Sequence, residues 1–284
     1  MNDLISIIIP FYSQKQWLKE ALDSLLNQEY KSIEVILIND GSNEEIDDLI
    51  YFYSGKITLH YLVQENAGPA VARNLGIEKA KGKYICFLDA DDLWEPQKLQ
   101  KQLKFHHLQD FQWSITNYQL FLDESKEKLP IKHHLEGGDV FNRSLFSCAI
   151  ATPTVMIETE MLRNNKQLRF IEETRYGEDT LFWFNLLSLY PVGYLDEILT
   201  QVRIRQNNAA KMVNIQLSAR AYIYQYFRNR KFVLNKRNIP NSARLIYHLS
   251  FLFNKCNPNK NEAIAKVLYL PIWLLFKIFY KINK

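Results

Sequence analysis

Three carboxylates, Asp89, Asp91 and Asp92, stand within four residues directly after the apolar run 84–88. That run is typical of a buried strand, so the carboxylates are expected at its exposed carboxyl end. Acidic side chains this close repel one another unless a cation lies among them, and oxygen ligands are those that Mg²⁺ and Mn²⁺ prefer. The cluster therefore predicts a metal site that works together with substrate phosphates. An acidic turn capping a helix that begins near Pro96 is the alternative.

Asp40 also follows a strand-like run, residues 33–38, and it precedes a Gly-Ser turn. Its carboxylate could accept a hydrogen bond from the N–H of a nucleobase, because Gly41 would let the backbone approach a ligand closely. An Asx-turn that only reverses the chain is the alternative explanation.

Asn66 and Gly68 come at the start of a helical pattern. The free N–H groups and the dipole of a helix N-terminus attract phosphate, so this segment is a candidate for binding a phosphorylated ligand. Arg73, one turn further, would add a cation or orient the acidic cluster. Helix capping alone would equally explain Asn66 and Gly68.

Glu178 and Asp179 stand at the start of a strongly apolar helical run. One of the two could act as a general base held by a rigid element. Acidic residues also favour the first turn of any helix, which is the alternative.

Apolar strands alternate with amphipathic helices in the first part of the chain. The strand-like runs are residues 4–9 (closed by Pro10), 33–38, 57–63 and 84–88. This βαβαβαβ order predicts a parallel sheet with helices on both faces. Ligands of such sheets bind beyond the carboxyl ends of the strands, where the polar groups above all fall.

The pattern changes after residue 108. Short alternating runs at 113–122 and 154–157 indicate an antiparallel extension of the sheet, and an apolar helix is expected at 179–189. Two more strands are expected up to Arg203. From about Lys211 onward the chain is expected to be helical.

Charge is divided unevenly along the 284 residues. Of 35 Lys/Arg and 31 Asp/Glu, 16 basic and one acidic lie in 203–284, which leaves 19 basic and 30 acidic in 1–202. The acidic part of the chain could bind a metal ion, and the basic part is expected to bind an anionic partner. Three separated cysteines and no recognisable secretory segment favour a cytoplasmic protein without disulfides.

The run 267–280 (VLYLPIWLLFKIFY) is nearly all apolar and contains Pro271, which is expected to break it. Fourteen helical residues reach about 21 Å, short of the ~30 Å hydrocarbon core. Aromatic residues and flanking lysines instead predict a segment that lies in the interface of an anionic membrane. A helix packed on the rest of the protein or an oligomer contact is the alternative, and nucleic acid is not expected as a partner because no recognition fold accompanies the charge.

The order of these motifs closely resembles family-2 inverting glycosyltransferases with the GT-A fold, of the bacterial surface-polysaccharide type. The matching segments are IIIPFY from Ile7, SLLNQ from Ser24, DGS from Asp40, NAGPAVARNLG from Asn66, DADDLW from Asp89 and GED from Gly177. The resemblance covers roughly residues 4–205. It implies a Rossmann-like parallel sheet with an antiparallel extension, in a catalytic domain 1–205 (nucleotide-binding half 1–108, acceptor half 109–205). The sequence pattern adds a basic, aromatic helical region at 206–284.

The resemblance also implies roles for single residues. Pro10, Tyr12 and Asp40 would line the nucleoside pocket, with Tyr12 against the base and Asp40 accepting from the uracil N3–H. Asp91 would ligate the Mn²⁺ or Mg²⁺ that bridges the donor's diphosphate. Further implied donor-binding residues are Asn66, Gly68, Arg73 and Asp89, the last facing the ribose or the donor sugar.

Asp179 would be the catalytic base that deprotonates the acceptor hydroxyl, and Trp94 and Glu178 are candidates on the acceptor side. Trp94 packed beneath the metal loop is the alternative for that residue. Arg203 or Arg205 could touch the diphosphate, although an ordinary arginine in an edge strand is the simpler interpretation. The processive-synthase motif Gln-x-x-Arg-Trp is absent, so transfer of a single sugar is expected.

The resemblance therefore implies transfer of a sugar from a UDP-sugar to a glycan or glycolipid acceptor, by an enzyme peripheral on the inner face of the membrane. A sugar-nucleotidyltransferase is a second possibility, but the residues after the first strand are not the Gly-rich loop with Arg and Lys that it needs. A non-catalytic scaffold that binds nucleotide-sugar is a third.

Overall fold

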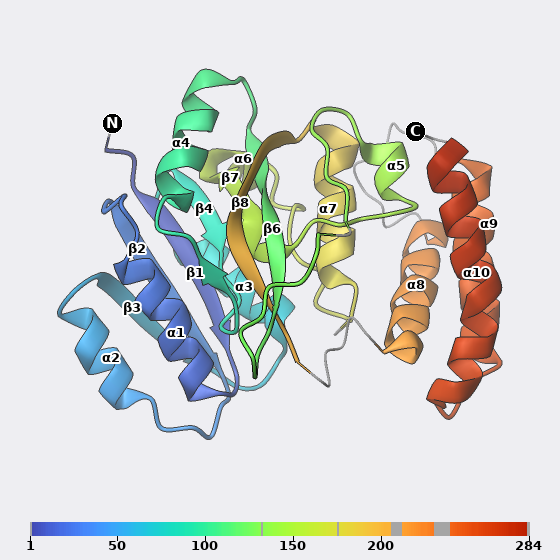
Figure 1. The fold of residues 1–284 in the computed structure, drawn as a ribbon, viewed down its shortest axis with the longest axis horizontal. Coiled ribbons are helices and arrows are strands. Elements are labelled where there is room, and N and C mark those ends of the chain that lie inside the picture. Colours follow the sequence, from blue (N-terminus) through green and yellow to red (C-terminus); the bar gives the residue numbers. More distant parts are fainter. Residues whose placement is uncertain (1, 132, 175, 206–211, 230–238, 283–284) are drawn as a thin grey trace. The chain divides into compact units, whose positions relative to one another are not determined.

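A computed structural model describes residues 2–131, 133–174, 176–205, 212–229 and 239–282 (Figure 1). The strands are β1 (Ile5–Phe11), β2 (Ile33–Asp40), β3 (Thr58–Gln64), β4 (Tyr84–Phe87), β5 (Leu93–Trp94), β6 (Trp113–Leu122), β7 (Val155–Glu158) and β8 (Gly193–Ile204). The helices are α1 (Lys15–Leu26), α2 (Asp47–Ser54), α3 (Pro69–Lys79), α4 (Lys98–Leu108), α5 (Phe141–Ser144), α6 (Thr159–Asn164), α7 (Glu178–Leu189), α8 (Val213–Arg228), α9 (Asn241–Lys255) and α10 (Glu262–Ile282), with a short 3₁₀ turn at Thr152–Thr154.

The chain forms two compact units. The first comprises residues 1–138, 150–172 and 191–204, and the second comprises 139–149, 173–190 and 205–284. The described part of the C-terminal region is helical, as expected, and the second unit also takes α5 and α7 from the middle of the chain. Lys211, where the helical region was expected to begin, lies outside the described residues.

The first unit is built on an eight-stranded sheet in the order β3-β2-β1-β4-β7-β6-β8-β5. β3, β2, β1 and β4 are parallel, which confirms the predicted βαβαβαβ arrangement. Ile5, Ile7 and Ile9 pack in one core cluster with residues of α1, α2 and α4. On the opposite face a Cβ on Gly76 of α3 would come within 2.4 Å of Ile8, so only glycine allows this approach. Helices therefore cover both faces of the parallel strands, as predicted.

Pro10 does not close the first strand, contrary to expectation. β1 continues to Phe11, and Pro10 is in register with Ile38 of β2. The pairing of β1 with β4 ends at Ile8, so no ladder on that side requires an N–H from Pro10.

The extension of the sheet is mixed rather than wholly antiparallel. β7 is antiparallel to β4 and β6, but β6 and β8 run parallel. One twelve-residue strand, β8, replaces the two strands expected up to Arg203. Its register against β6 jumps from Leu195 to Ile198, which leaves Asp196 and Glu197 as a bulge that interrupts the apolar pattern.

Buried His106 on α4 predicts a specific loss of stability in acid. It is 7% exposed, its Nε2 lies 2.8 Å from Ser114 Oγ, and burial lowers its pKa to about 4. In the unfolded chain this histidine binds a proton below about pH 6.5, whereas in the native state it stays neutral down to about pH 4. The free energy of unfolding should therefore fall by about 3 kcal/mol as pH drops through that window. Urea unfolding at a series of pH values should show that the free energy of unfolding of His106→Gln lacks this fall. Identical pH profiles for the variant and wild type would contradict the prediction.

Candidate active site

The acidic cluster follows β4, at the carboxyl edge of the parallel strands. Asp89 accepts a 2.7 Å hydrogen bond from Nη2 of Arg73 on α3, and that guanidinium is itself buried. Asp92 is 4% exposed, and its Oδ1 accepts from the backbone N–H of Arg203 at 2.8 Å. Burial, followed by the charges of Asp91 and Asp89, raises the pKa of Asp92 well above its ordinary value. Asp91 stands between these two anchors and is partly exposed.

Arg203 of β8 braces this loop from the other side, a role that the sequence did not reveal. Its Nε donates to the backbone oxygen of Asp91 at 2.7 Å, and its Nη2 donates to Glu20 at 2.7 Å. Nη1 donates to Asp123. The guanidinium is fully buried, so its polar atoms serve the protein. Burial raises the pKa values of Glu20 and Asp123, but the hydrogen bonds and charge of Arg203 lower them below their ordinary range. Arg203 thus positions the loop that carries Asp91, a role that the sequence interpretation of an ordinary edge-strand arginine does not describe.

Replacing Arg203 with methionine is expected to lower the free energy of unfolding by about 3 kcal/mol or more, because two partly buried carboxylates lose their cation. The matched control is Lys126→Met. Lys126 contacts the same two carboxylates, at 3.4 and 3.5 Å, but from an exposed side chain, so it should change stability by at most about 0.5 kcal/mol. Urea unfolding measures both, and equal losses would contradict a bracing role for Arg203.

Asp40 closes β2 and is 5% exposed. Its Oδ1 accepts from Gln64 Nε2 and Ala67 N, both at 2.8 Å, and its Oδ2 accepts from Gly68 N at 2.9 Å. The carboxylate therefore occupies the N-terminus of α3 that was predicted to attract phosphate. A carboxylate offers about four lone-pair positions, so Oδ2 retains capacity for one further donor.

The loops after β2 and β3 touch at Gly41. Gly41 has φ 72°, and a Cβ there would come within 2.7 Å of the backbone nitrogen of Asn66. Oδ1 of Asn39 accepts from Ser42 N at 2.7 Å, so the side chain that holds the turn after β2 is that of Asn39, and Asp40 does not form the Asx-turn considered for it. Asn66 is exposed, whereas Gly68 is buried at the start of α3.

Asn74, next to Arg73 on α3, holds a distant segment that sequence reasoning did not connect with it. Its side chain donates to Phe170 O at 2.9 Å and to Glu172 at 2.7 Å, and it accepts from Phe170 N at 2.9 Å. The ring of Phe170 lies 5.3 Å from the guanidinium carbon of Arg73. The Arg-Asn pair thus joins the acidic loop to the segment that precedes α7 in sequence.

Tyr12 and Trp94 differ sharply in exposure. Tyr12, directly after β1, is 55% exposed, and Pro10 is partly exposed, so both are accessible to a ligand. Trp94 is 3% exposed, donates from Nε1 to Pro153 O at 2.8 Å, and has the Lys98 ammonium 3.8 Å from its ring centroid. Its ring is enclosed by the core and is not available to stack on a sugar. Trp94 therefore has a packing role, as in the alternative considered above.

In the second unit, Glu178 and Asp179 form the first turn of α7, entered through Gly177 at φ 84°. Glu178 is buried at 7% exposure, whereas Asp179 is partly exposed. Oδ1 of Asp179 accepts from the backbone N–H of Thr180 at 2.6 Å and from its hydroxyl at 3.3 Å. Of the two carboxylates, Asp179 is therefore the accessible one.

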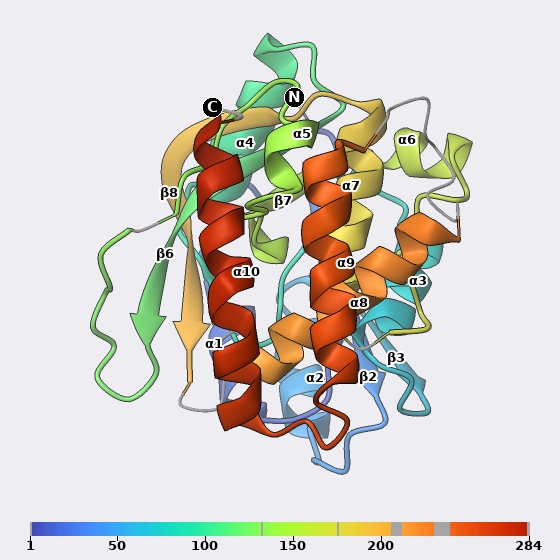
Figure 2. The same ribbon diagram turned by 90° about the vertical axis from the view of Figure 1, so that its right-hand side faces the viewer.

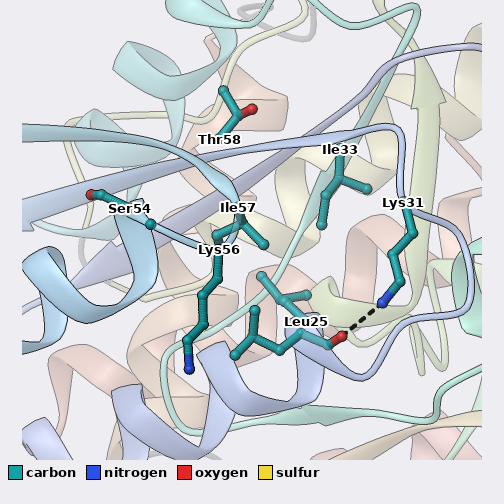
Figure 3. Close-up of a pocket in the computed structure, with 9 residues that line it drawn as sticks. Leu25, Lys31, Ile33, Ser54, Lys56, Ile57 and Thr58 are labelled. Atoms are coloured by element: carbon teal, nitrogen blue, oxygen red, sulfur yellow. Dashed lines mark hydrogen bonds between the residues drawn. The ribbon is translucent and has the colours of Figure 1, made fainter.

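A pocket of about 510 Å³ lies at the opposite edge of the sheet (Figure 3). It is lined by the starts of β2 and β3, including Ile33 and Thr58, and by the ends of α1 and α2. Lys31 on its rim donates to Leu26 O at 2.9 Å. Because the acidic loop follows the carboxyl ends of the strands, this pocket is separate from the candidate site.

The acidic loop offers a metal ion few protein ligands. Among the described residues no three His, Cys, Asp or Glu side chains gather closely enough to hold an ion. Asp89 is engaged by Arg73 and Asp92 is buried, whereas Asp91 is partly exposed. Mg²⁺ commonly binds through one or two carboxylates plus substrate phosphates, and a single carboxylate suits that arrangement.

Known proteins are similar to this chain in sequence. A family model described as "Glycosyl transferase family 2" matches residues 6–175. An uncharacterized glycosyltransferase of Rickettsia bellii is 41% identical over 208 residues, 73% of this chain and 30% of the relative. The putative teichuronic acid biosynthesis glycosyltransferase TuaG of Bacillus subtilis is 30% identical over 211 residues, 72% of this chain and 81% of TuaG. The chain thus spans less than a third of the length of the Rickettsia bellii relative.

Two solved structures are similar in fold. The crystal structure of Staphylococcus aureus TarS 1-349 in complex with UDP-GlcNAc superposes with a TM-score of 0.67 at 20% identity, over 96% of this chain and 79% of that one. Mannosyltransferase PcManGT from Pyrobaculum calidifontis, in complex with GDP-Man and Mn²⁺, gives 0.60 at 15% identity, over 99% and 81%. The fold is therefore the GT-A glycosyltransferase fold with added C-terminal helices, as predicted. The chain belongs to glycosyl transferase family 2.

Proposed function

We propose that this protein transfers one sugar, a hexose or N-acetylhexosamine, from a UDP-sugar to a glycan or glycolipid acceptor, with inversion at the anomeric carbon. The observation that carries the proposal is the bracing of the Asp91 loop. Arg73 holds Asp89 on one side, and Arg203 holds Asp92 and the Asp91 carbonyl on the other. Such a rigid support fixes a catalytic carboxylate in place before substrate binds.

The donor's nucleoside would bind beside the loops after β1 and β2. The exposed ring of Tyr12 offers a stacking surface, and the partly exposed Pro10 precedes it by two residues. Oδ2 of Asp40 has capacity to accept from the uracil N3–H while it holds α3. The bound UDP-GlcNAc of TarS supports a nucleotide-sugar donor, and the choice of UDP rests on this carboxylate.

Asp91 would hold a divalent cation together with the donor's diphosphate, and the Mn²⁺ of PcManGT supports such a site. When bound, the ion offsets the negative charge that develops on the departing UDP. Arg73 keeps Asp89 in place for the ribose or donor sugar. Asp92, whose pKa burial raises, supports the loop from inside and is not a ligand in this proposal.

Asp179 would be the base. It removes the proton from the acceptor hydroxyl, whose oxygen forms a bond to the anomeric carbon while the bond to the diphosphate oxygen breaks on the opposite face. Thr180 restrains one carboxylate oxygen of Asp179. Glu178 is buried in the first turn of α7 and therefore suits a supporting role beside Asp179, on the acceptor side.

Bacterial surface polysaccharide, such as lipopolysaccharide or capsule, is the proposed setting, because TuaG is named for teichuronic acid biosynthesis. The test is UDP release from a panel of UDP-sugars with Mn²⁺, with membrane extract as acceptor source and the product's anomeric configuration read by NMR. A retained configuration would overturn the inverting mechanism. Pyrophosphate-dependent formation of UTP would instead favour a nucleotidyltransferase, and donor binding with no product would favour a scaffold.

A further inference from the structure

The last helix of the second unit, α10, has one face that no described part of the chain covers. α10 continues through Pro271 from Glu262 to Ile282, so the predicted break is wrong, and by length and apolar composition this helix could cross a membrane. Its inner face packs on α8 and α9, which lie alongside it (Figure 2). The buried residues of α10 are Ala265, Ile272 and Phe276.

The outer face of α10 is an apolar stripe. Its large exposed members recur every three or four residues, so they lie on one side of the helix: Ile264, Val267, Leu270, Leu274, Ile278 and Ile282. Exposed fractions reach 75% at Val267 and 70% at Ile282. From Ile264 to Ile282 the stripe is about 27 Å long, at 1.5 Å per residue. Contiguous exposed apolar surface of this kind marks an interaction site.

Lysines follow the same stripe. Lys266, Lys277 and Lys281 are exposed on α10, and the Lys277 ammonium lies 3.8 Å from the ring centroid of Trp273. At 100° per residue Lys266 and Lys277 fall together on one flank of the stripe, with Trp273 next to them. An apolar face bordered by lysine and tryptophan complements a surface with an apolar interior and anionic headgroups.

Two features of α10 favour lying in such a surface over crossing it. Pro271 has no N–H, so the carbonyl of Val267 lacks its usual helical donor near the middle of the helix, where a spanning segment would expose it to hydrocarbon. The inner face also packs against a cation, since the guanidinium of Arg220 lies 4.9 Å from the Phe276 ring and 5.0 Å from the Tyr269 ring. A charge so placed would be costly within a bilayer.

We propose that the outer stripe of α10 docks this protein flat on anionic lipid bilayers, with the apolar residues in the acyl boundary and the lysines at the headgroups. This inference is independent of the proposed sugar transfer, because it requires only lipid.

The test is sedimentation of the full chain with vesicles of phosphatidylcholine and phosphatidylglycerol at 3:1, compared with phosphatidylcholine alone. Leu274→Ser/Ile278→Ser should reduce partitioning by about 100-fold, since each apolar side chain gains roughly the free energy of a tenfold change on burial. Lys266→Gln/Lys277→Gln should reduce partitioning by about 30-fold, and only on the anionic vesicles. In about 1 M NaCl the binding of wild type to the anionic vesicles should fall toward its level on phosphatidylcholine alone, because salt screens headgroup attraction.

The matched control is Val63→Ser/Leu108→Ser, two residues of the first unit that are 66% and 70% exposed. It should bind vesicles like wild type, and circular dichroism checks that every variant is folded. Unchanged binding of the α10 variants, or no binding of wild type, would overturn the proposal. Binding to the anionic vesicles that stays unchanged in 1 M salt would overturn the role of the lysines at the headgroups. A lipid-free dimer that Leu274→Ser/Ile278→Ser converts to monomers would assign the stripe to a second copy.

Discussion

Replacing Asp91 with asparagine is expected to lower the rate of sugar transfer by about 10²–10³, the usual cost of one electrostatic contact made to the departing group. Asparagine keeps the size of the side chain but removes the negative charge that would hold the cation. Initial rates of UDP release should fall, and the concentration of Mn²⁺ needed for half-maximal rate should rise.

Asp92→Asn is the matched control for this substitution. Asp92 is buried, accepts from Arg203 N through Oδ1, and has a pKa that burial raises, so an asparagine oxygen can replace it with little change. We expect its rate to stay within about tenfold of wild type, in line with a hydrogen bond that is preserved. If Asp91→Asn instead keeps the wild-type rate and metal dependence, the metal role belongs to another residue.

Replacing Asp179 with asparagine is expected to lower kcat by about 10²–10⁴ while the KM for the donor stays nearly constant, because general base catalysis contributes that factor and acts on the acceptor. The Thr180 backbone N–H can still donate to the side-chain oxygen of asparagine, so the first turn of α7 should persist. Isothermal titration with UDP and Mn²⁺ separates donor binding from turnover.

Glu178→Gln is the comparison for Asp179. The two residues are adjacent, but Glu178 is buried and its neighbour is partly exposed. We expect Glu178→Gln to retain turnover within about tenfold, as for a residue that does not exchange protons with substrate. The reverse order, with Glu178→Gln inactive and Asp179→Asn active, would move the base to Glu178.

Local pattern was sufficient for the parallel half of the fold. Alternation of apolar strands with helices depends on neighbours in sequence, so β1 to β4 and α3 were predictable from residues 4–88. Pro10 was misjudged because its tolerance depends on where the pairing of β1 with β4 ends, at Ile8 and Phe87, which lie 79 positions apart in sequence. The bulge at Asp196 similarly depends on β6.

Some features of the candidate site were likewise predictable from local sequence, and others depend on residues far apart in the chain. The clustering of Asp89, Asp91 and Asp92 is local, and the sequence showed it directly. The support around them is not local, because Arg203 reaches Asp91 across 112 positions and Glu20 across 183. No spacing rule connects such positions, and burial decides which arginine serves structure and which could meet a ligand.

The carboxylate of Asp40 has a consequence for redesigning nucleotide preference. In the proposed function Asp40 would accept from the base, and in the structure the same side chain ties Gln64, Ala67 and Gly68 to the end of β2. Exchanging it to favour guanine over uracil would also release the loop that starts α3, the helix that carries Arg73. A change of nucleotide preference at Asp40 would therefore need a second substitution that restores acceptors for the N–H groups of Ala67 and Gly68.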